Sequence, residues 1–291
     1  MIQKLAAAAL FAALAGAPLV SPARDDLARN LIGSCVGCRL PKDLHGQDLH
    51  GLRFVGDDLR GVDFRHADLR DADFTGSNLE SARFDGADLH GVRFVGVRLR
   101  DVSLARASTD GVSFVGVSVD FATIDRATAA LILRDCTGCD LRGADVRGMD
   151  LRGAKDVGAN LRDAKLSGAD LRGANLVGAN ATGADLSSAK LDGATLIATR
   201  LRGAKVAGAS FGDARLCGRS DDRAGDLGEQ RTVCADLRGV DLHGVDLRRV
   251  QWCANDDRGR DVIATRDCRP VTRAELTGDA HADLTGALAP A

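Results

Sequence analysis

Residues 139–218, written in fives, read CDLRG-ADVRG-MDLRG-AKDVG-ANLRD-AKLSG-ADLRG-ANLVG-ANATG-ADLSS-AKLDG-ATLIA-TRLRG-AKVAG-ASFGD-ARLCG. Of these 16 units, 13 begin with Ala, 11 carry Leu at the third place and 12 end in Gly. Self-similarity at a short fixed period is typical of a solenoid, in which no unit buries its own apolar side and each unit stacks on the next. The period therefore predicts a repetitive fold.

A period of five fits neither an amphipathic helix, whose apolar residues recur every 3 or 4 positions, nor a coiled coil with its spacing of 3.5. It fits a short extended segment, because strand alternation points a small Ala and a large Leu inward on either side of an outward residue. The Gly then turns the chain at a corner, where a positive φ costs glycine least. The pattern predicts an all-β coil.

The pattern A-(D/N)-L-x-G resembles that of the pentapeptide-repeat family. This resemblance implies a right-handed quadrilateral β-helix (a β-solenoid) with one unit per side and roughly four units per coil. The earlier run, residues 42–124, tests the number of sides. Six of the nine Phe fall on its large inward positions, and a 20-residue step on a four-sided coil returns to the same wall. The expected core ladder is Phe54, Phe74, Phe94 and Phe114.

Residues 1–23 have the pattern of a secretory signal peptide. Lys4 gives a basic start, residues 5–17 form an apolar stretch of 13, and cleavage could follow Ala17 or Ala23. The stretch is shorter than a membrane span, and no other segment approaches one. We therefore predict export to the periplasm or the extracellular space, with a buried N-terminal helix as the alternative.

Two interruptions divide the repeats into three runs. The register slips by two residues around 125–138, which is either a restart cap or an excursion from one continuous coil, and a polar segment follows Leu216. The predicted order is a signal peptide (1–23), an N-terminal cap with a C-x-x-C motif (24–41), run 1 (42–124), a break or helical cap (125–138), run 2 (139–217), a loop insertion (218–234), run 3 (235–252) and a disulfide-tied C-terminal segment with a flexible tail (253–291).

In an exported chain, eight cysteines indicate disulfides. The candidates are Cys35, Cys38, Cys136, Cys139, Cys217, Cys234, Cys253 and Cys268. Two C-x-x-C motifs could share a zinc ion in the cytosol, but about five coils at ~4.8 Å per strand separate them by roughly 20 Å or more. A redox role needs a βαβ setting that the repeats do not offer. Local bridges are favoured, and Cys217 is expected to pair with Cys234, because the repeat stops before Cys217 and resumes after Cys234.

The outward residues most often read Asp-Leu-Arg, so opposite charges lie two positions apart on one face. Run 1 has 10 basic and 14 acidic residues, and run 2 has 12 and 9. Some members of the resembled family inhibit DNA gyrase by resembling duplex DNA, a role that needs a dominant negative field. This nearly neutral surface argues against that role. Nucleic-acid binding is also disfavoured, since there is one Trp and no Tyr for base stacking.

Two acidic features qualify as candidate sites. Asp48, Asp68 and Asp88 lie 20 residues apart and are expected to stack on one wall, where a carboxylate ladder could hold a cation such as calcium. Screening by Arg70 and solvent is the favoured interpretation, so no metal is predicted. Asp156 takes a large inward position, and there we expect the chain to slip so that Val157 turns inward instead.

The sequence therefore predicts a secreted, non-catalytic solenoid that acts as a rigid scaffold or protein-interaction surface. No cofactor is expected, and the protein partner is not encoded in any motif. A ligand-binding or cation-binding module, using the Asp ladder or the Cys217–Cys234 loop, is the alternative. A DNA-mimic inhibitor is more remote, and an enzyme is disfavoured because no catalytic cluster can be placed in a pocket.

Overall fold

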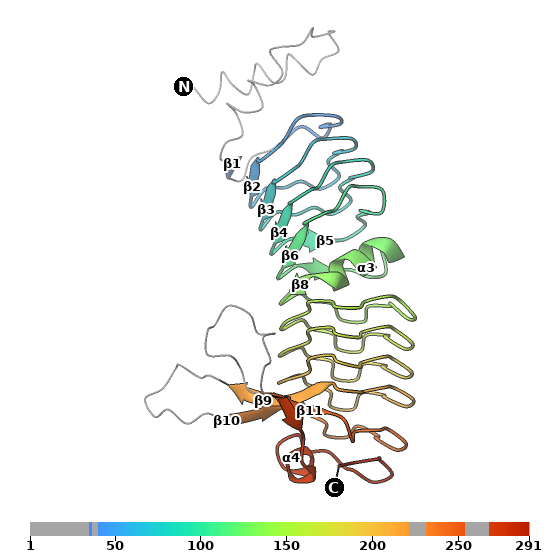
Figure 1. Cartoon of the computed structure of the whole chain (residues 1–291). Helices are drawn as coiled ribbons and strands as arrows, with labels where there is room; N and C mark the ends of the chain where they lie inside the picture. Colours follow the sequence, from blue (N-terminus) through green and yellow to red (C-terminus); the bar gives the residue numbers. More distant parts are fainter. Residues whose placement is uncertain (1–34, 37–39, 221–230, 254–267, 291) are drawn as a thin grey trace, which may run out of the picture. The chain divides into compact units, whose positions relative to one another are not determined.

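The computed structural model describes residues 35–36, 40–220, 231–253 and 268–290 (Figure 1). The chain forms two compact units that meet in sequence between Ser113 and Phe114. The expected signal peptide at 1–23 and most of the N-terminal cap lie outside the described residues.

The first unit is a coil of short parallel strands. They are β1 (Cys35–Val36), β2 (Arg53–Val55), β3 (Asp73–Thr75), β4 (Arg93–Val95) and β5 (Arg98–Leu99), and β6 (Ser113–Val115) begins at the last residue of the unit. Figure 1 shows β2, β3 and β4 stacked one above the next. Phe54 lies opposite Phe74, and Phe74 lies opposite Phe94. A 20-residue step thus returns to the same wall, and the four-sided coil is confirmed.

The interior of this unit is an aromatic core. The rings of Phe54 and Phe74 stack with their centroids 4.7 Å apart, and those of Phe74 and Phe94 stack at 5.4 Å. Phe64 and Phe84 form a second stack on the opposite wall at 5.2 Å, and Phe64 meets Phe74 edge-on at 5.8 Å. Stacked pairs along each wall and edge contacts between walls are the favoured aromatic geometries. Phe114, the fourth residue of the expected ladder, belongs to the second unit.

The second unit repeats the coil with Leu and Ala inside. Its elements are β7 (Ser118–Val119), α3 (Arg126–Arg134), β8 (Cys136–Thr137), β9 (Arg215–Ser220), β10 (Arg231–Cys234), β11 (Gln251–Cys253), β12 (Cys268–Pro270) and α4 (Arg273–Thr277). Most sides between α3 and β9 form single parallel bridges, each to a residue 20 positions away, as from Lys155 to Asn175 and from Asn175 to Thr195.

The break at 125–138 is an excursion from the coil. Asp125 caps α3 by accepting a hydrogen bond from the Thr128 backbone at 2.9 Å, as an N-cap carboxylate does. On either side of the helix the coil keeps its register, because Phe114 pairs with Cys136 and Ser118 pairs with Asp140. Asp135 already pairs with Lys155, so the coil resumes a few residues before the expected start of run 2 at 139.

The expected slip at Asp156 is wrong. Asp156 keeps the large inward position with 1% of its surface exposed, and Val157 lies partly exposed. Backbone hydrogen bonds explain why. The Asp156 backbone N–H donates to the Asn175 carbonyl at 2.9 Å, and the Lys155 backbone N–H donates to the Arg134 carbonyl at 3.0 Å. A one-residue slip would break such bonds and turn the following side chains to the opposite face. The ladder therefore holds the carboxyl group inside the coil.

The insertion and the C-terminus both return to the coil. β9 and β10 pair antiparallel, with Cys217 opposite Cys234, and Arg200 bridges to Asp236 although the insertion lies between them in sequence. Residues 268–290 pack as a C-terminal cap in place of the expected flexible tail. A capping box between Thr272 and Glu275 begins α4, and buried side chains cover the last coil: Val271, Leu276, Ala280, Ala282 and Leu284.

Candidate functional site

The outward residues of the coil form ion pairs within single units. In Asp-Leu-Arg, the Arg guanidinium lies over the Asp two positions earlier and donates to both carboxylate oxygens, as from Arg172 to Asp170 at 2.8 and 2.6 Å. The same bidentate contact recurs at 58/60, 63/65, 68/70, 140/142, 145/147, 150/152, 236/238 and 246/248. Strand alternation brings the two side chains to one face, and the fork of Arg matches a carboxylate.

These pairs fix the charge state of the surface. Hydrogen bonds from Arg65 hold the pKa of Asp63 at about 2, and those from Arg238 hold the pKa of Asp236 at about 2. The pKa of Asp170 is lowered by Arg172 in the same way. The pairs are largely exposed, so they add little to stability. Their effect is to leave walls of alternating, locally neutral charge.

On one of the walls of the second unit that depart from this pattern, several arginines lie close together. At the Asp position this wall carries Asn160, Asn180 and Arg200 in three successive coils before Asp236 restores the rule. Arg162 and Arg202 therefore have no carboxylate two residues before them. A groove of about 310 Å³ runs over these coils. Sequence reasoning missed this wall, although writing the units in columns of four would have shown it.

The structure brings Asp48, Asp68 and Asp88 together on one wall of the first unit, as neighbouring bridges of the coil. Arg70 lies among them: it pairs with Asp68 at 2.6 Å and approaches Asp88 at 3.9 Å. Oxygens of Asp48 and Asp88 also accept hydrogen bonds from the backbone two residues on, at His50 and His90. In the described part of the chain no three His, Cys, Asp or Glu side chains are grouped as a metal site.

We expect millimolar calcium to leave the unfolding temperature unchanged, because the Arg70 guanidinium occupies the place between carboxylates that a cation would take. Thermal unfolding with calcium and with EDTA tests this. The informative control is Arg70→Ala, which removes the competing charge. A calcium-dependent rise in the wild type that disappears in Asp68→Ala would instead establish a cation site.

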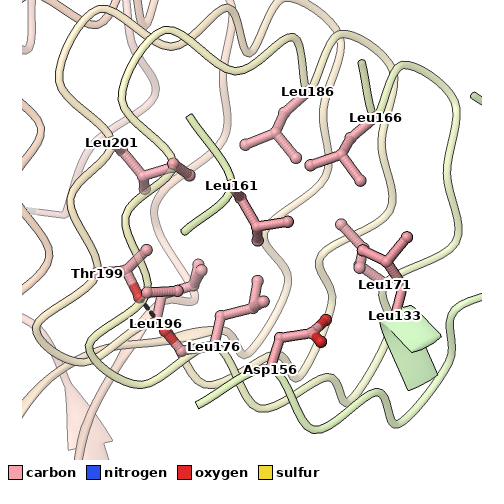
Figure 2. Close-up of a pocket in the computed structure, with 12 residues that line it drawn as sticks. Leu133, Asp156, Leu161, Leu166, Leu171, Leu176, Leu186, Leu196, Thr199 and Leu201 are labelled. Carbon is pink, nitrogen blue, oxygen red and sulfur yellow. Dashed lines mark hydrogen bonds between the residues drawn. The ribbon is translucent and has the colours of Figure 1, made fainter. Parts of the chain in front are cut away.

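The cavity beside Asp156 in the interior of the second unit is too small for a substrate. Asp156 lines a cavity of about 10 Å³ among leucines from successive coils, and Figure 2 shows its carboxyl group surrounded by Leu133, Leu161, Leu171 and Leu176. A volume of this size is about that of one water molecule. Burial, reinforced by the charge of Asp135, raises the pKa of Asp156 well above its ordinary value.

Three disulfides lie in the described residues: Cys136–Cys139, Cys217–Cys234 and Cys253–Cys268. Cys38, the expected local partner of Cys35, lies outside the described residues. The two C-terminal bridges each join antiparallel partners at the neck of a segment that leaves the coil. Trp252, beside the second neck, is covered by the Arg269 guanidinium at 4.6 Å from its ring centroid.

Non-reducing peptide mapping should recover a Cys217–Cys234 crosslink. Leu216 accepts a backbone hydrogen bond from Ala235 at 2.8 Å, so the two ends of the insertion meet within one side of the coil. Closing a loop of this size stabilises a protein by about 3 kcal/mol through the unfolded state. A map that joins Cys217 to Cys253 or Cys268, or leaves it as a thiol, would contradict the pairing; Cys136–Cys139 serves as the internal control.

A family model for pentapeptide repeats matches the chain in eight copies, over residues 58–96, 135–155 and 159–196. These residues form the parallel coil described above. The chain therefore contains pentapeptide repeats, and its fold is the four-sided β-helix typical of such repeats.

The chain is similar to several solved pentapeptide-repeat structures. A protein of the Arabidopsis thaliana thylakoid lumen is 28% identical over 39% of this chain and 68% of that one, with a TM-score of 0.23. HetL, involved in heterocyst differentiation regulation in Nostoc sp. strain PCC 7120, is 25% identical over 70% and 84%, with a TM-score of 0.21. QnrB1, a plasmid-mediated fluoroquinolone resistance protein, is 21% identical over 68% and 76%, with a TM-score of 0.24. No curated protein sequence matches the chain.

Proposed function

We propose that the protein is an exported, non-catalytic scaffold whose outer walls bind another protein. The observation that carries this proposal is that apolar residues occupy the inward positions of the coil and charged residues the outward positions. Inward positions are filled by Phe, Leu, Val and Ala, whereas outward positions present a regular, fixed lattice of charged groups. Such a surface suits recognition by complementary charge, which gives specificity and orientation.

Two features support export. The first 23 residues have the pattern of a signal peptide, and disulfides of the kind found at the two C-terminal necks persist in oxidising compartments. Within the described residues, no helix has the length and apolar character needed to cross a bilayer. A fusion of residues 1–23 to a reporter that is active only after export tests the localisation directly.

The binding role is tested with the mature, oxidised protein as bait in an extract of its native envelope. The matched variant exchanges the members of two ion pairs on one wall, as Asp150→Arg/Arg152→Asp with Asp170→Arg/Arg172→Asp. This variant keeps the net charge and the ion pairs but exchanges the positions of the positive and negative side chains that a partner would contact. A specific partner should be retained by the wild type and lost from a wall-reversed variant. Retention by variants reversed on every wall would contradict recognition through the outer walls.

The alternative, a ligand-binding or cation-binding module, has less support at the Asp ladder, where Arg70 already pairs with the carboxylates. The DNA-mimic alternative is weakened by the bidentate Asp–Arg pairs, because each pair cancels the negative charge that such mimicry needs.

A further inference from the structure

We propose that the arginine groove, lined by Arg162, Asn180, Thr182, Arg200, Arg202 and Arg238, binds a tetrahedral oxyanion, a phosphate or sulfate group. Asp236 is the acidic residue among the groups that line it. This inference goes beyond the scaffold proposal and does not depend on it, because it concerns a ligand of one wall of the second unit.

The first argument is charge. Four arginines against one aspartate leave an excess of three positive charges around the groove. Asp236 is already shared, since Arg238 pairs with it at 2.6 Å and Arg202 at 3.5 Å. In Asp-Leu-Arg units elsewhere a similar arginine lies over its own carboxylate, as Arg172 lies over Asp170. In the described residues, Arg162 and Arg200 have no carboxylate partner. A bound anion would supply the negative charge that these arginines lack.

The second argument is the kind of polar atom on offer. Thr182 donates its hydroxyl hydrogen to the amide oxygen of Asn180 at 2.7 Å, and its backbone N–H donates to the same oxygen at 3.3 Å. The Asn180 acceptor is thereby used, and its amide N–H₂ remains as a donor. Guanidinium groups carry only donors. The groove is therefore rich in N–H groups and poor in free acceptors, which favours an anionic ligand over a cation or a neutral polar molecule.

The third argument is geometry. Arg200 and Arg202 stand two residues apart on one side of the coil, and Arg238 follows on the next coil, where Asp236 bridges to Arg200. Neighbouring strands lie about 4.8 Å apart, so guanidinium groups from two neighbouring coils can both donate hydrogen bonds into the groove. A tetrahedral group with charge near −2 and three exposed oxygens can use donors from several directions, whereas one carboxylate offers two oxygens and a single charge.

The test uses the purified, oxidised protein at low ionic strength, where screening of exposed charges is weakest. Inorganic phosphate is titrated while the Arg Nε–H resonances are followed by NMR. We expect saturable shifts at Arg200 and Arg202, and about a tenfold or greater loss of affinity in Arg200→Ala/Arg202→Ala, as for the removal of charge-assisted hydrogen bonds. The matched control, Arg152→Ala/Arg172→Ala, removes the same charge from another wall and should keep its affinity within about twofold.

A second arm uses glycerol 3-phosphate to distinguish the sources of the group. Binding of the ester at an affinity similar to that of inorganic phosphate indicates a phosphate carried on a larger molecule, and binding of inorganic phosphate alone indicates the free ion; both outcomes support the oxyanion site. Equal losses in the two double variants would show general attraction to charge and overturn it. So would the absence of saturable binding, or binding of triglutamate in preference to both phosphates, which would assign the groove to an acidic peptide.

Discussion

Replacing Phe74 with alanine is expected to lower the free energy of unfolding around its coils by about 3–5 kcal/mol. Phe74 is fully buried, with Phe54 and Phe94 stacked on its two faces and Phe64 and Phe84 against its edges. The backbone of each wall is held by its own ladder, so the neighbouring rings cannot close the space that the phenyl group leaves. A cavity with a full loss of contacts is the expected result.

The measurement must be local, because long repeat arrays do not unfold in one cooperative step. Native-state hydrogen exchange at the Asp73 amide, which donates to the Leu52 carbonyl at 2.9 Å, reports the opening of these coils. Phe74→Leu is the matched control: it keeps an apolar residue of the kind found on the other walls, and should lose clearly less than the alanine variant. A loss in Phe74→Ala well below this range would show that the ring is not confined on all sides.

Replacing Asp156 with leucine is expected to raise the free energy of unfolding by about 2–5 kcal/mol. Neither carboxylate oxygen of Asp156 has a hydrogen-bond partner in the described part of the chain. Leaving a buried polar group unpaired costs about 1–3 kcal/mol, and full burial of a leucine contributes about 1.5–3 kcal/mol. The same ladder carries Leu176 and Leu196 in the next coils, where the surroundings already accept that side chain.

The pH dependence separates the charge from the polarity of Asp156. Its folded pKa is raised by burial above the unfolded value near 3.9, so the wild type gains stability from this group only at low pH. As pH rises above that unfolded value, stability should fall by up to about 1.4 kcal/mol per pH unit, until the pH reaches the folded pKa. Asp156→Asn cannot ionise. Its stability relative to the wild type should therefore increase from pH 4 to pH 8.

The surface carboxylates have the opposite pH dependence, because their folded pKa values are lowered by Arg and their contribution is lost as pH falls. They are common to both proteins, so the difference between wild type and Asp156→Asn isolates the buried group. Hydrogen exchange at the backbone amides of the wall that carries Asp156 measures the local stability around this group. A difference that stays constant over this pH range would contradict the raised pKa.

The period of the sequence was enough to predict a coil, and its four sides followed from the resemblance to pentapeptide repeats together with the spacing of the Phe residues. A strict spacing of five fits a short extended segment that buries Ala and Leu together, and Phe54, Phe74 and Phe94 show which units share a wall. Asp156 was misjudged because side-chain preference was weighed alone. In the structure, backbone bonds to Asn175 and from neighbouring units outweigh the cost of one buried carboxyl group.

The C-terminal cap and the arginine groove needed information that the period does not hold. In the cap, Leu276 and Leu284 become buried because this segment meets the last coil, where the Leu237 backbone N–H donates to the Ala280 carbonyl. The capping box at Thr272 and Glu275 was visible in the sequence, but its position over the coil was not. The groove depends on which units become neighbours, a relation that appears in the sequence only when the units are written in columns of four with the insertion before Asp236 left out.

The Asp–Arg pairs also bear on how such a chain can lengthen. Each pair closes within three consecutive residues of one unit, so its two charges are balanced without help from the coils above and below. Copying or deleting a block of four units would carry each such pair along intact and keep the twenty-residue step. The charge pattern of these units is therefore compatible with duplication in such blocks. The coil containing Arg200 differs, because its unit carries arginines without a carboxylate of their own.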